Sequence, residues 1–146
     1  MPATLDRTAA VEVVATRLLP RASLITRLLL RETGVGRAEA GILGALEDGP
    51  LRITELAATQ ALAQPTVTQL VARLEEQGRV ARGRHPGDGR VVLVSLTGEG
   101  RAALDGLRDV YRGALREALA GRSDADVRAL AKATDMLGEL IAELRR

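Results

Sequence analysis

Two short runs of strand-type residues stand near the middle of a chain whose other periodic segments are helical. The first run covers residues 79–84, and the second covers residues 91–96 and is rich in β-branched side chains. Between them lies the segment His85-Pro86-Gly87-Asp88-Gly89-Arg90, whose residue types favour a turn. The sequence therefore predicts one β-hairpin with a mobile, basic tip inside a largely helical chain.

Aromatic residues are nearly absent, because Tyr111 is the one aromatic among 146 residues. Hydrophobic residues still make up 46% of the chain, which allows a packed core and argues against disorder. The core must therefore consist of Leu, Val, Ile and Ala, and the long Leu/Ala/Arg/Glu stretches favour helices. We expect a mainly α fold with a small β-hairpin wing, of the size of one domain or one intertwined dimer unit.

Several functional classes are excluded by residue types that the chain lacks. There is no cysteine, which excludes a disulfide framework, a thiolate metal site and a cysteine redox sensor. His85 is the single histidine, so a multi-histidine metal site is excluded as well. The sequence opens without a signal-peptide pattern, and its apolar runs are too short to cross a bilayer. We expect a cytoplasmic protein with no cofactor, no metal and no membrane partner.

Apolar residues at helical spacing predict six helices in all. Pro20 should kink or break the first helix, because proline removes a hydrogen bond and clashes with the preceding turn. Residues 51–53 are expected to be extended, and Thr97 is expected to cap the long helix that follows the hairpin. The expected helices cover approximately residues 5–31, 37–47, 54–59, 65–77, 98–120 and 124–144.

The order of helix, tight turn, helix and hairpin is that of a winged helix-turn-helix. The helix at 65–77 begins at Pro65, a residue favoured at a helix start, and Gly78 ends it. It buries an apolar face, so its polar face can enter the major groove of duplex DNA. Arginine on the hairpin can enter a narrow minor groove. The residues expected on the buried face are Val67, Leu70, Val71 and Leu74.

The candidate DNA contacts follow from these two elements. Glutamine can pair with adenine and threonine with a base or a thymine methyl, whereas Arg73, further along the helix, suits a phosphate. Any one of these side chains could instead be a solvated surface residue, and the ordered set of four elements carries the interpretation. The candidates are Gln64, Pro65, Thr66, Thr68, Gln69 and Arg73 on the helix, and Arg82, Arg84, Asp88 and Arg90 on the hairpin.

Several motifs of this chain resemble the multiple-antibiotic-resistance regulator (MarR) family, and the resemblance covers nearly the whole chain. The Asp-x-Arg motif of the hairpin, followed by a strand that ends in Leu-Thr, is a strong mark of that family. The segments that carry the resemblance are ITELA at 53–57, QPTVTQLV at 64–71, LEEQG at 74–78, VAR at 80–82, DGR at 88–90 and VSLTGEG at 94–100.

The resemblance implies roles for two hairpin residues and a quaternary structure. Arg90 is implied to enter the minor groove, and Asp88 to orient the hairpin arginines; the alternative for Asp88 is a plain turn residue. Family members are homodimers whose N- and C-terminal helices interdigitate. Residues 1–36 and 101–146 would then form the dimerisation region around a DNA-binding domain at 37–100. The near-heptad seam of Val127, Leu130, Thr134, Leu137, Ile141 and Leu144 fits that role, although such a seam can also be intrachain core.

The implied function is that of a sequence-specific transcriptional regulator, a repressor relieved by a small ligand, that binds a pseudo-palindromic operator as a homodimer. Arg17, Arg21 or Arg27 could pair with a lipophilic anion, or be solvated helix-face residues. One departure is Arg52, where relatives place Ser or Thr as a helix cap. Arg52 cannot accept from backbone N–H groups, so the start of the helix could be looser, or Thr54 could cap it one register later. Arg52 could instead contact the DNA backbone.

Two rival functions come from other classes. An enzyme would need a nucleophile–base pair, paired carboxylates or a glycine-rich phosphate loop, and the sequence offers none of these. A winged-helix module that binds proteins would lack salt-dependent DNA affinity. We therefore expect double-stranded DNA, a second copy of the chain and a small-molecule effector as partners, and no enzymatic activity.

Overall fold

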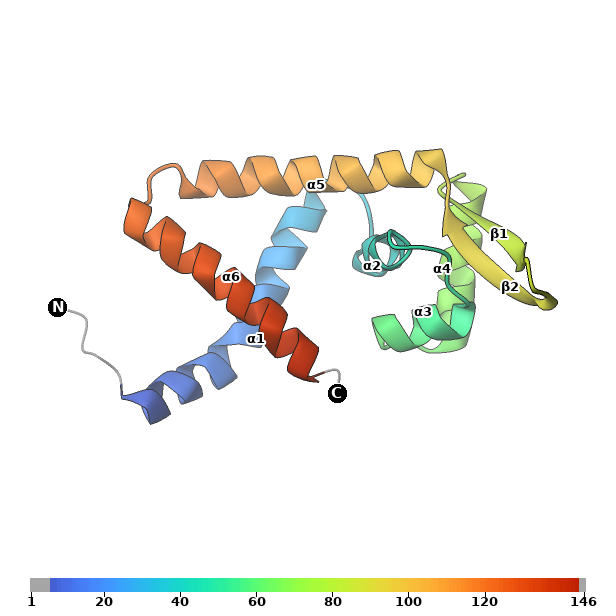
Figure 1. The fold of residues 1–146 in the computed structure, drawn as a ribbon. Coiled ribbons are helices and arrows are strands. Elements are labelled where there is room, and N and C mark those ends of the chain that lie inside the picture. The colour runs from blue at the N-terminus through green and yellow to red at the C-terminus, as the bar shows by residue number, and fades with distance from the viewer. Residues whose placement is uncertain (1–5, 145–146) are drawn as a thin grey trace. The chain divides into compact units, whose positions relative to one another are not determined.

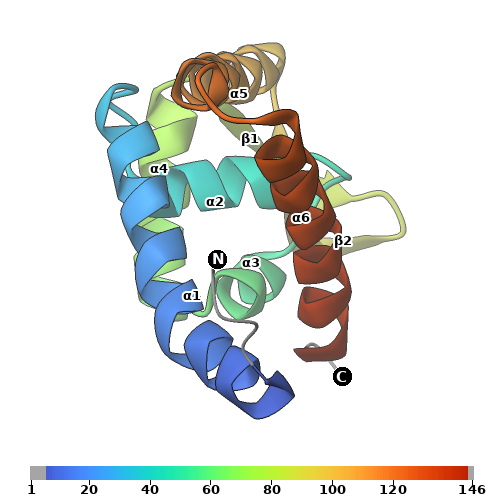
Figure 2. The ribbon, with the colours of Figure 1, turned by 90° about the vertical axis from the view of Figure 1, so that its left-hand side faces the viewer.

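A computed structural model describes residues 6–144, and these form six helices and one antiparallel pair of strands (Figures 1 and 2). The predicted fold class, mainly helical with one small hairpin, is therefore confirmed. The described residues fall into two compact units that divide between Tyr111 and Arg112. The elements are α1 (Arg7–Arg31), α2 (Arg37–Ala45), α3 (Ile53–Gln60), α4 (Gln64–Glu76), β1 (Val80–His85), β2 (Asp88–Leu96), α5 (Gly98–Leu119) and α6 (Asp124–Leu144).

The core of the first unit lies where α2, α3, α4 and the base of the hairpin pack together. Leu30 of α1 and two leucines of α5 close the same core. Each fully buried aliphatic side chain contributes about 1.5–3 kcal/mol by leaving water, so aliphatic residues alone suffice here. The side chains with no exposed surface are Ile42, Leu43, Leu56, Val67, Val71, Leu74 and Val94.

The first helix is continuous through Pro20, so the break that the sequence allowed does not occur. Figures 1 and 2 both show that α1 bends along its length, as expected of a helix with an internal proline. Its start is fixed by Asp6, whose Oδ1 accepts a hydrogen bond from the Ala9 main-chain N–H at 2.7 Å.

The extended stretch between α2 and α3 is shorter than the sequence predicted. Leu51 alone bridges to Val94, through two main-chain hydrogen bonds of 2.8 and 3.0 Å, and Ile53 already belongs to α3. Arg52 is the N-cap residue, and its main-chain N–H donates to Glu55 Oε2 at 2.7 Å. The proposed cap at Thr54 is therefore wrong, because a glutamate one turn into α3 satisfies the helix start instead.

The hairpin is longer and its turn tighter than the sequence predicted. Pairing runs from Val80 opposite Leu96 to His85 opposite Asp88, with one irregularity between Arg84 and His85. The expected six-residue connection therefore shrinks to two residues, Pro86 and Gly87. Neither Pro86 nor Gly87 has a positive φ, so the turn is not of the primed type that matches the strand twist, and the register irregularity lies next to it.

The base of the hairpin is fastened to the start of α5. Thr97 caps α5 as predicted, because its Oγ1 accepts from the Gly100 main-chain N–H at 3.0 Å. The same hydroxyl donates to the Gly78 carbonyl oxygen, and the Thr97 N–H donates to the Arg79 carbonyl oxygen at 3.1 Å. Gly100 lies so close to that carbonyl that a Cβ atom would overlap it.

The second unit contains the C-terminal part of α5 and the helix α6. Ser123 caps α6, since its Oγ accepts from the Asp126 N–H at 3.2 Å and donates to the Asp126 carboxylate at 2.8 Å. No residue of α6 is buried within the part of the chain that the structure describes. The apolar side chains of the predicted seam on α6 are therefore exposed.

Candidate nucleic-acid interface

The helix α4 presents one buried and one exposed face. Val67, Val71 and Leu74 have no exposed surface, and Leu70 is half-buried beside them. Pro65 occupies the first turn, where its missing N–H leaves no hydrogen bond unmade. The helix ends at Glu76, and Gly78 follows in the left-handed conformation at φ +71°. The buried face holds the exposed face in a fixed orientation.

The turn before α4 is tight and sets its angle to α3. Ala61 adopts the left-handed conformation, with φ 51° and ψ 43°, at the end of α3. The Leu62 N–H donates to the Ala57 carbonyl oxygen at 3.0 Å, which satisfies a carbonyl that the helix end leaves open. Leu62 packs on the core, so the turn is anchored by a side chain as well.

All six residues that the sequence assigned to the DNA-contacting face of α4 are exposed. The hydroxyl of Thr68 donates to the Gln64 carbonyl oxygen at 2.9 Å, inside the helix. The other five side chains are the amides of Gln64 and Gln69, the Pro65 ring, the Thr66 hydroxyl and the Arg73 guanidinium. Together they form a polar, hydrogen-bonding surface on one helix, as readout of base edges requires.

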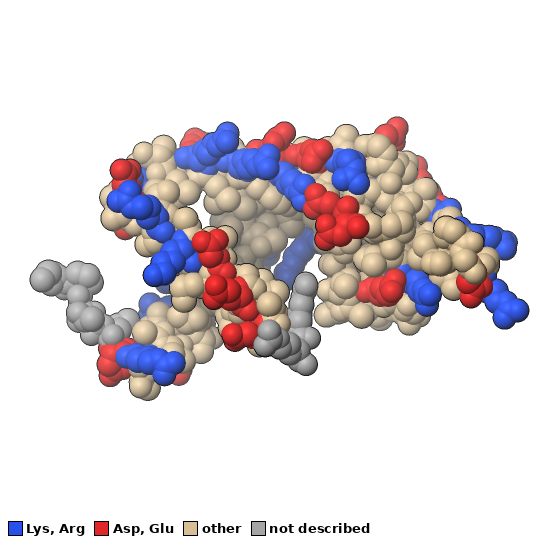
Figure 3. Space-filling model, in the orientation of Figure 1, with Lys and Arg blue, Asp and Glu red and all other residues tan. Residues whose placement is uncertain are grey.

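Arginine gathers on the hairpin. Arg84 and Arg90 are exposed, and Figure 3 shows basic side chains projecting at the hairpin end of the molecule. Arg84 Nη1 donates to the Gly89 carbonyl oxygen at 3.2 Å, across the turn. Asp88 Oδ1 accepts from the Arg90 main-chain N–H at 3.0 Å. Asp88 thus contacts the Arg90 backbone, which is the contact of a turn residue.

The tip is held by a second local contact. His85 Nδ1 accepts from the Gly87 main-chain N–H at 2.9 Å. The imidazole therefore closes the two-residue turn from one side while Asp88 closes it from the other. These two hydrogen bonds give the basic tip a defined backbone although it has no core of its own.

Arg82 is tied to α4, a contact that the sequence did not reveal. Its Nε lies 3.6 Å from Glu75 Oε2, its main-chain N–H donates to Glu75 Oε1 at 3.3 Å, and its Nη2 donates to the Thr68 carbonyl oxygen at 3.4 Å. The hairpin and α4 are therefore joined by a charged pair as well as by the core. Arg82 links the two predicted DNA-contacting elements.

Arg73 also has a carboxylate partner. Its Nη1 lies 3.3 Å from Oε1 of Glu39, a residue of α2 that is 7% exposed. The guanidinium itself remains largely exposed, with 66% of the side chain accessible. This pair was not predicted, because the partners are 34 positions apart. The one local signal was the acidic residue in the first turn of α2, which does not specify a partner on α4.

Arg52, the candidate contact to the DNA backbone, is exposed at the start of α3. Its main-chain N–H is occupied by Glu55, whereas its side chain provides no cap. The guanidinium therefore takes no part in the start of the helix. The assignment of Arg52 to a DNA phosphate stays a prediction.

The first unit contains a cavity of about 440 Å³ between α1, α2 and α5. Arg17, Arg21 and Arg27, for which the sequence left open either a bound anion or solvation on the helix face, are not among the residues that line it. Burial raises the pKa of the Tyr111 hydroxyl at this cavity, so the phenol stays protonated and can donate a hydrogen bond. The lining residues are Thr26, Leu30, Arg37, Ala40, Gly41, Gln60, Leu104, Leu107, Arg108 and Tyr111.

Arg108, a residue of α5 that lines this cavity, forms a two-bond ion pair with Glu47. Its Nη1 donates to Glu47 Oε1 at 2.6 Å, and its Nη2 donates to Glu47 Oε2. This hydrogen bonding holds the pKa of Glu47 below its ordinary value and raises that of Arg108. The pair connects the residues after α2 to α5 on the surface of the first unit.

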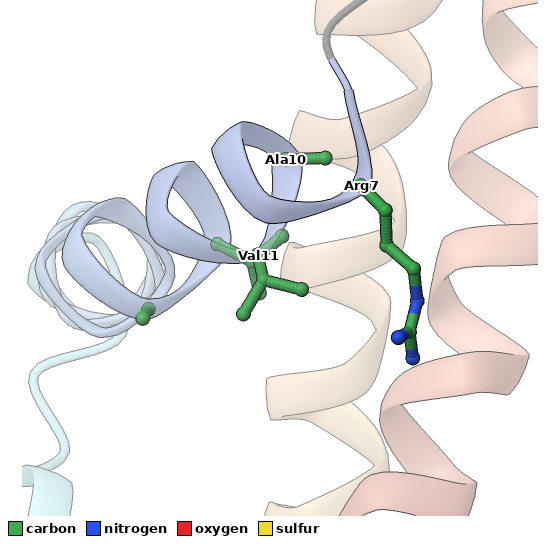
Figure 4. Close-up of a pocket in the computed structure, with 5 residues that line it drawn as sticks. Arg7, Ala10 and Val11 are labelled. Atoms are coloured by element: carbon green, nitrogen blue, oxygen red, sulfur yellow. The ribbon is translucent and has the colours of Figure 1, made fainter.

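The terminal helices carry exposed apolar side chains. On α1, Val11 and Val14 are 58% and 53% exposed and line a shallow apolar depression with Arg7 and Ala10 (Figure 4). On α6, every aliphatic residue of the predicted dimerisation seam is exposed, by amounts from 37% for Leu137 to 79% for Leu144. These side chains lie outside the core of the first unit, to which α1 contributes Leu30 and α6 contributes no buried residue.

The described residues hold no cluster of three or more potential metal ligands. None of the helices described over residues 6–144 combines the length and the apolarity that crossing a membrane requires.

Comparisons with known proteins agree on one family. A family model described as MarR family matches residues 33–91. An uncharacterised HTH-type transcriptional regulator of Mycobacterium bovis is 35% identical over 102 residues, which is 68% of this chain and 66% of that protein. The match thus spans just under two thirds of that relative.

Two solved structures extend the likeness to nearly the whole chain. A MarR family protein from Bacillus stearothermophilus is 26% identical, with a TM-score of 0.75 over 96% of this chain and 99% of its own. BpsR of Bordetella bronchiseptica, whose DNA binding is regulated by 6-hydroxynicotinic acid, is 25% identical, with a TM-score of 0.62 over 85% of this chain and 98% of its own.

Proposed function

The chain belongs to the MarR family, and on that premise we propose that it is a transcriptional regulator that binds duplex DNA as a homodimer. The observation that carries the proposal is the pairing of two surfaces in one lobe. The exposed polar face of α4 is fixed by a fully buried opposite face, and the arginine-bearing hairpin is tied directly to α4 through Arg82 and Glu75. One lobe thereby offers a helix for the major groove and arginines for the adjacent minor groove.

Each contact has a role that its chemistry supports. Gln64 and Gln69 are the candidates for pairing with adenine, and Thr66 for a base edge or a thymine methyl. Arg90 is the candidate for the minor groove, with Asp88 holding its backbone at the tip. The contacts proposed to phosphate come from Arg52, Arg73, Arg82 and Arg84, all of which belong to this lobe.

The homodimer is supported by the apolar surfaces that the chain leaves open. Leu130 and Ile141 of α6 are 52% and 51% exposed, and α6 has no buried residue. Exposed aliphatic side chains repeated at helical spacing cost free energy in water, and a second copy of the chain would cover them. Two copies would present two α4 helices to successive turns of the duplex, so the site should be pseudo-palindromic with half-sites about one helical turn apart.

Relief of repression by a small anion is supported by the cavity between α1, α2 and α5. It combines the cation Arg37 with the protonated phenol of Tyr111 on an aliphatic floor, and its second cation, Arg108, is paired with Glu47. BpsR, a structural neighbour, has its DNA binding regulated by an aromatic acid. We propose that a small organic anion binds here and that its binding shifts the population away from the DNA-competent state.

The proposal is tested by selecting bound duplexes from a randomised DNA pool and sequencing them. We expect enrichment of a pseudo-palindrome, and about tenfold weaker binding of it by Arg90→Ala. Arg116→Ala removes the same charge from an exposed position of α5 and should leave the affinity near that of the wild type. No enrichment at moderate salt would overturn the proposal and favour a winged-helix protein module.

A further inference from the structure

Glu39 is the one buried charged residue among the residues that the structure describes. Taking a carboxylate out of water is costly unless partners compensate for the lost hydration. Glu39 has two such partners, the Gly36 main-chain N–H at 3.3 Å from Oε2 and Arg73 Nη1 at 3.3 Å from Oε1. Arg73 is the partner that lies on α4, the helix proposed to read DNA.

Arg73 stands between a buried anion and the solvent. The guanidinium carries five donors, and the contact with Glu39 uses one of its nitrogens while 66% of the side chain stays accessible. Arg73 lies seven residues after Thr66, so both are on the same side of α4. The remaining donors are thus available to a second anion on the side where DNA is proposed to bind.

We propose that Glu39 is a positioning residue that holds Arg73 as a fixed phosphate clamp, so that one guanidinium bridges a buried carboxylate and a DNA phosphate. This rests on the proposed function. An unrestrained arginine loses side-chain entropy when it binds a phosphate, which lowers the affinity. An arginine that Glu39 already holds has lost part of that entropy before DNA binds. Glu39 also receives the Gly36 N–H, so the same carboxylate links the turn before α2 to α4.

The arrangement has a counterpart along the other edge of the exposed face of α4. Glu75 lies seven residues after Thr68 and pairs with Arg82 of the hairpin at 3.6 Å. That pair joins two elements that both face the proposed DNA site, and Glu75 is 40% exposed. Glu39 differs because it is buried in α2, so it can hold Arg73 without itself approaching a phosphate.

The proposal makes a prediction whose sign is opposite to that of simple electrostatics. Glu39→Gln removes a negative charge, which by itself should strengthen binding to DNA. If Glu39 positions Arg73, the substitution instead weakens binding, by roughly fivefold to tenfold, and lowers the slope of log affinity against log salt by about one unit per subunit. Glu76→Gln, which removes an exposed carboxylate from α4, should strengthen binding.

The experiment measures affinity for the selected duplex at several salt concentrations for the wild type, Glu39→Gln, Arg73→Gln and the double variant. We expect both single variants to weaken binding and the double variant to be no weaker than Arg73→Gln. Circular dichroism confirms that each variant is folded. Arg73→Lys serves if Glu39→Gln does not fold, because it keeps the charge but loses the planar fork, and it should then bind more weakly than the wild type.

Three results would overturn the proposal. The first is that Glu39→Gln binds the duplex as tightly as the wild type or more tightly. The second is that Glu39→Gln weakens binding by the same factor whether residue 73 is Arg or Gln, which would mark a purely structural role. Arg73→Gln could also leave the affinity unchanged while the wild type binds the duplex, which leaves the proposed function standing. A wild type that binds no duplex removes the proposed function and this inference together.

Discussion

The lobe formed by α2, α3, α4 and the hairpin differs sharply from α6 in how far its apolar side chains are buried. In the lobe, Leu56 and Leu74 have no exposed surface, whereas Leu130 of α6 is 52% exposed and α6 buries nothing. Both regions carry apolar residues at helical spacing, so periodicity alone does not distinguish them. The lobe completes its core within one chain, whereas the apolar side chains of α6 are exposed, and we propose that a second copy of the chain covers them.

The largest effect is expected from placing charges in the α6 seam. Leu130→Glu combined with Leu137→Glu should convert the proposed dimer into monomers, because each chain would bury two glutamates against the apolar seam of its partner. The affinity for a duplex with two half-sites should fall by about 100-fold or more, since the two lobes would no longer bind as one unit. Sedimentation velocity and a DNA titration measure the two effects.

Lys132→Glu provides the matched control for those glutamates, because Lys132 is exposed on α6 outside the seam. It should remain dimeric. A doubly substituted chain that still sediments as a dimer would contradict the role given to the seam.

A smaller effect is expected from truncating one core residue and one seam residue to alanine. Leu56→Ala should lower the free energy of unfolding by about 2–5 kcal/mol, because it opens a cavity where the side chain had no exposed surface. It should leave the dimer dissociation constant unchanged. Ile141→Ala should weaken the dimer, measured by dilution, and leave the lobe's secondary structure intact by circular dichroism. Equal effects of both variants on dimer dissociation would remove the distinction between lobe and seam.

The attachment of the hairpin to α5 gives the next prediction. Gly100→Ala should destabilise the fold by about 1–3 kcal/mol, because the added methyl overlaps the Arg79 carbonyl oxygen, a main-chain atom. Gly106→Ala on the same helix meets no atom within 4 Å and should stabilise by about 0.5–1 kcal/mol. Thermal unfolding compares them, and two variants with the same melting temperature would show that Gly100 tolerates a side chain.

The smallest effect concerns the surface pair of Glu47 and Arg108. Hydrogen bonding to Arg108 lowers the pKa of Glu47 from its ordinary value of 4.5 in the folded chain. The pair therefore contributes stability above that value, and the contribution is lost as the pH falls through the lowered pKa. Denaturant unfolding between about pH 5 and pH 3 should show a shallower loss of stability for Glu47→Gln than for the wild type. Parallel curves would mean that the pair is not formed.

The spacing of apolar residues and the identity of the cap residues were sufficient to predict the helices and the hairpin. The spacing of Val67, Val71 and Leu74 identified the buried face of α4, and Thr97 was identified as the cap of α5 because a threonine precedes an acidic first turn. The fold class follows from these local features. The exact ends of the strands did not, because the pairing of His85 with Asp88 depends on a tight turn that composition only suggests.

Contacts between residues far apart in the sequence lay beyond this kind of prediction. The pairs Glu39–Arg73 and Glu75–Arg82 depend on how α2 and the hairpin pack on α4, which no local signal specifies. Arg52 was expected to leave α3 without a side-chain cap, but the compensating Glu55 was missed because Thr54 offered a simpler alternative. The candidate DNA contacts and the dimer seam remain predictions.

The most direct test counts the protein chains on a selected duplex. Sedimentation equilibrium of the complex gives its mass, first with both half-sites present and then with one half-site scrambled. If two lobes are joined through the terminal helices, two chains bind the intact duplex, and scrambling one half-site lowers the affinity by about 100-fold. One chain per intact duplex, or an affinity that does not depend on the second half-site, would contradict a dimeric regulator.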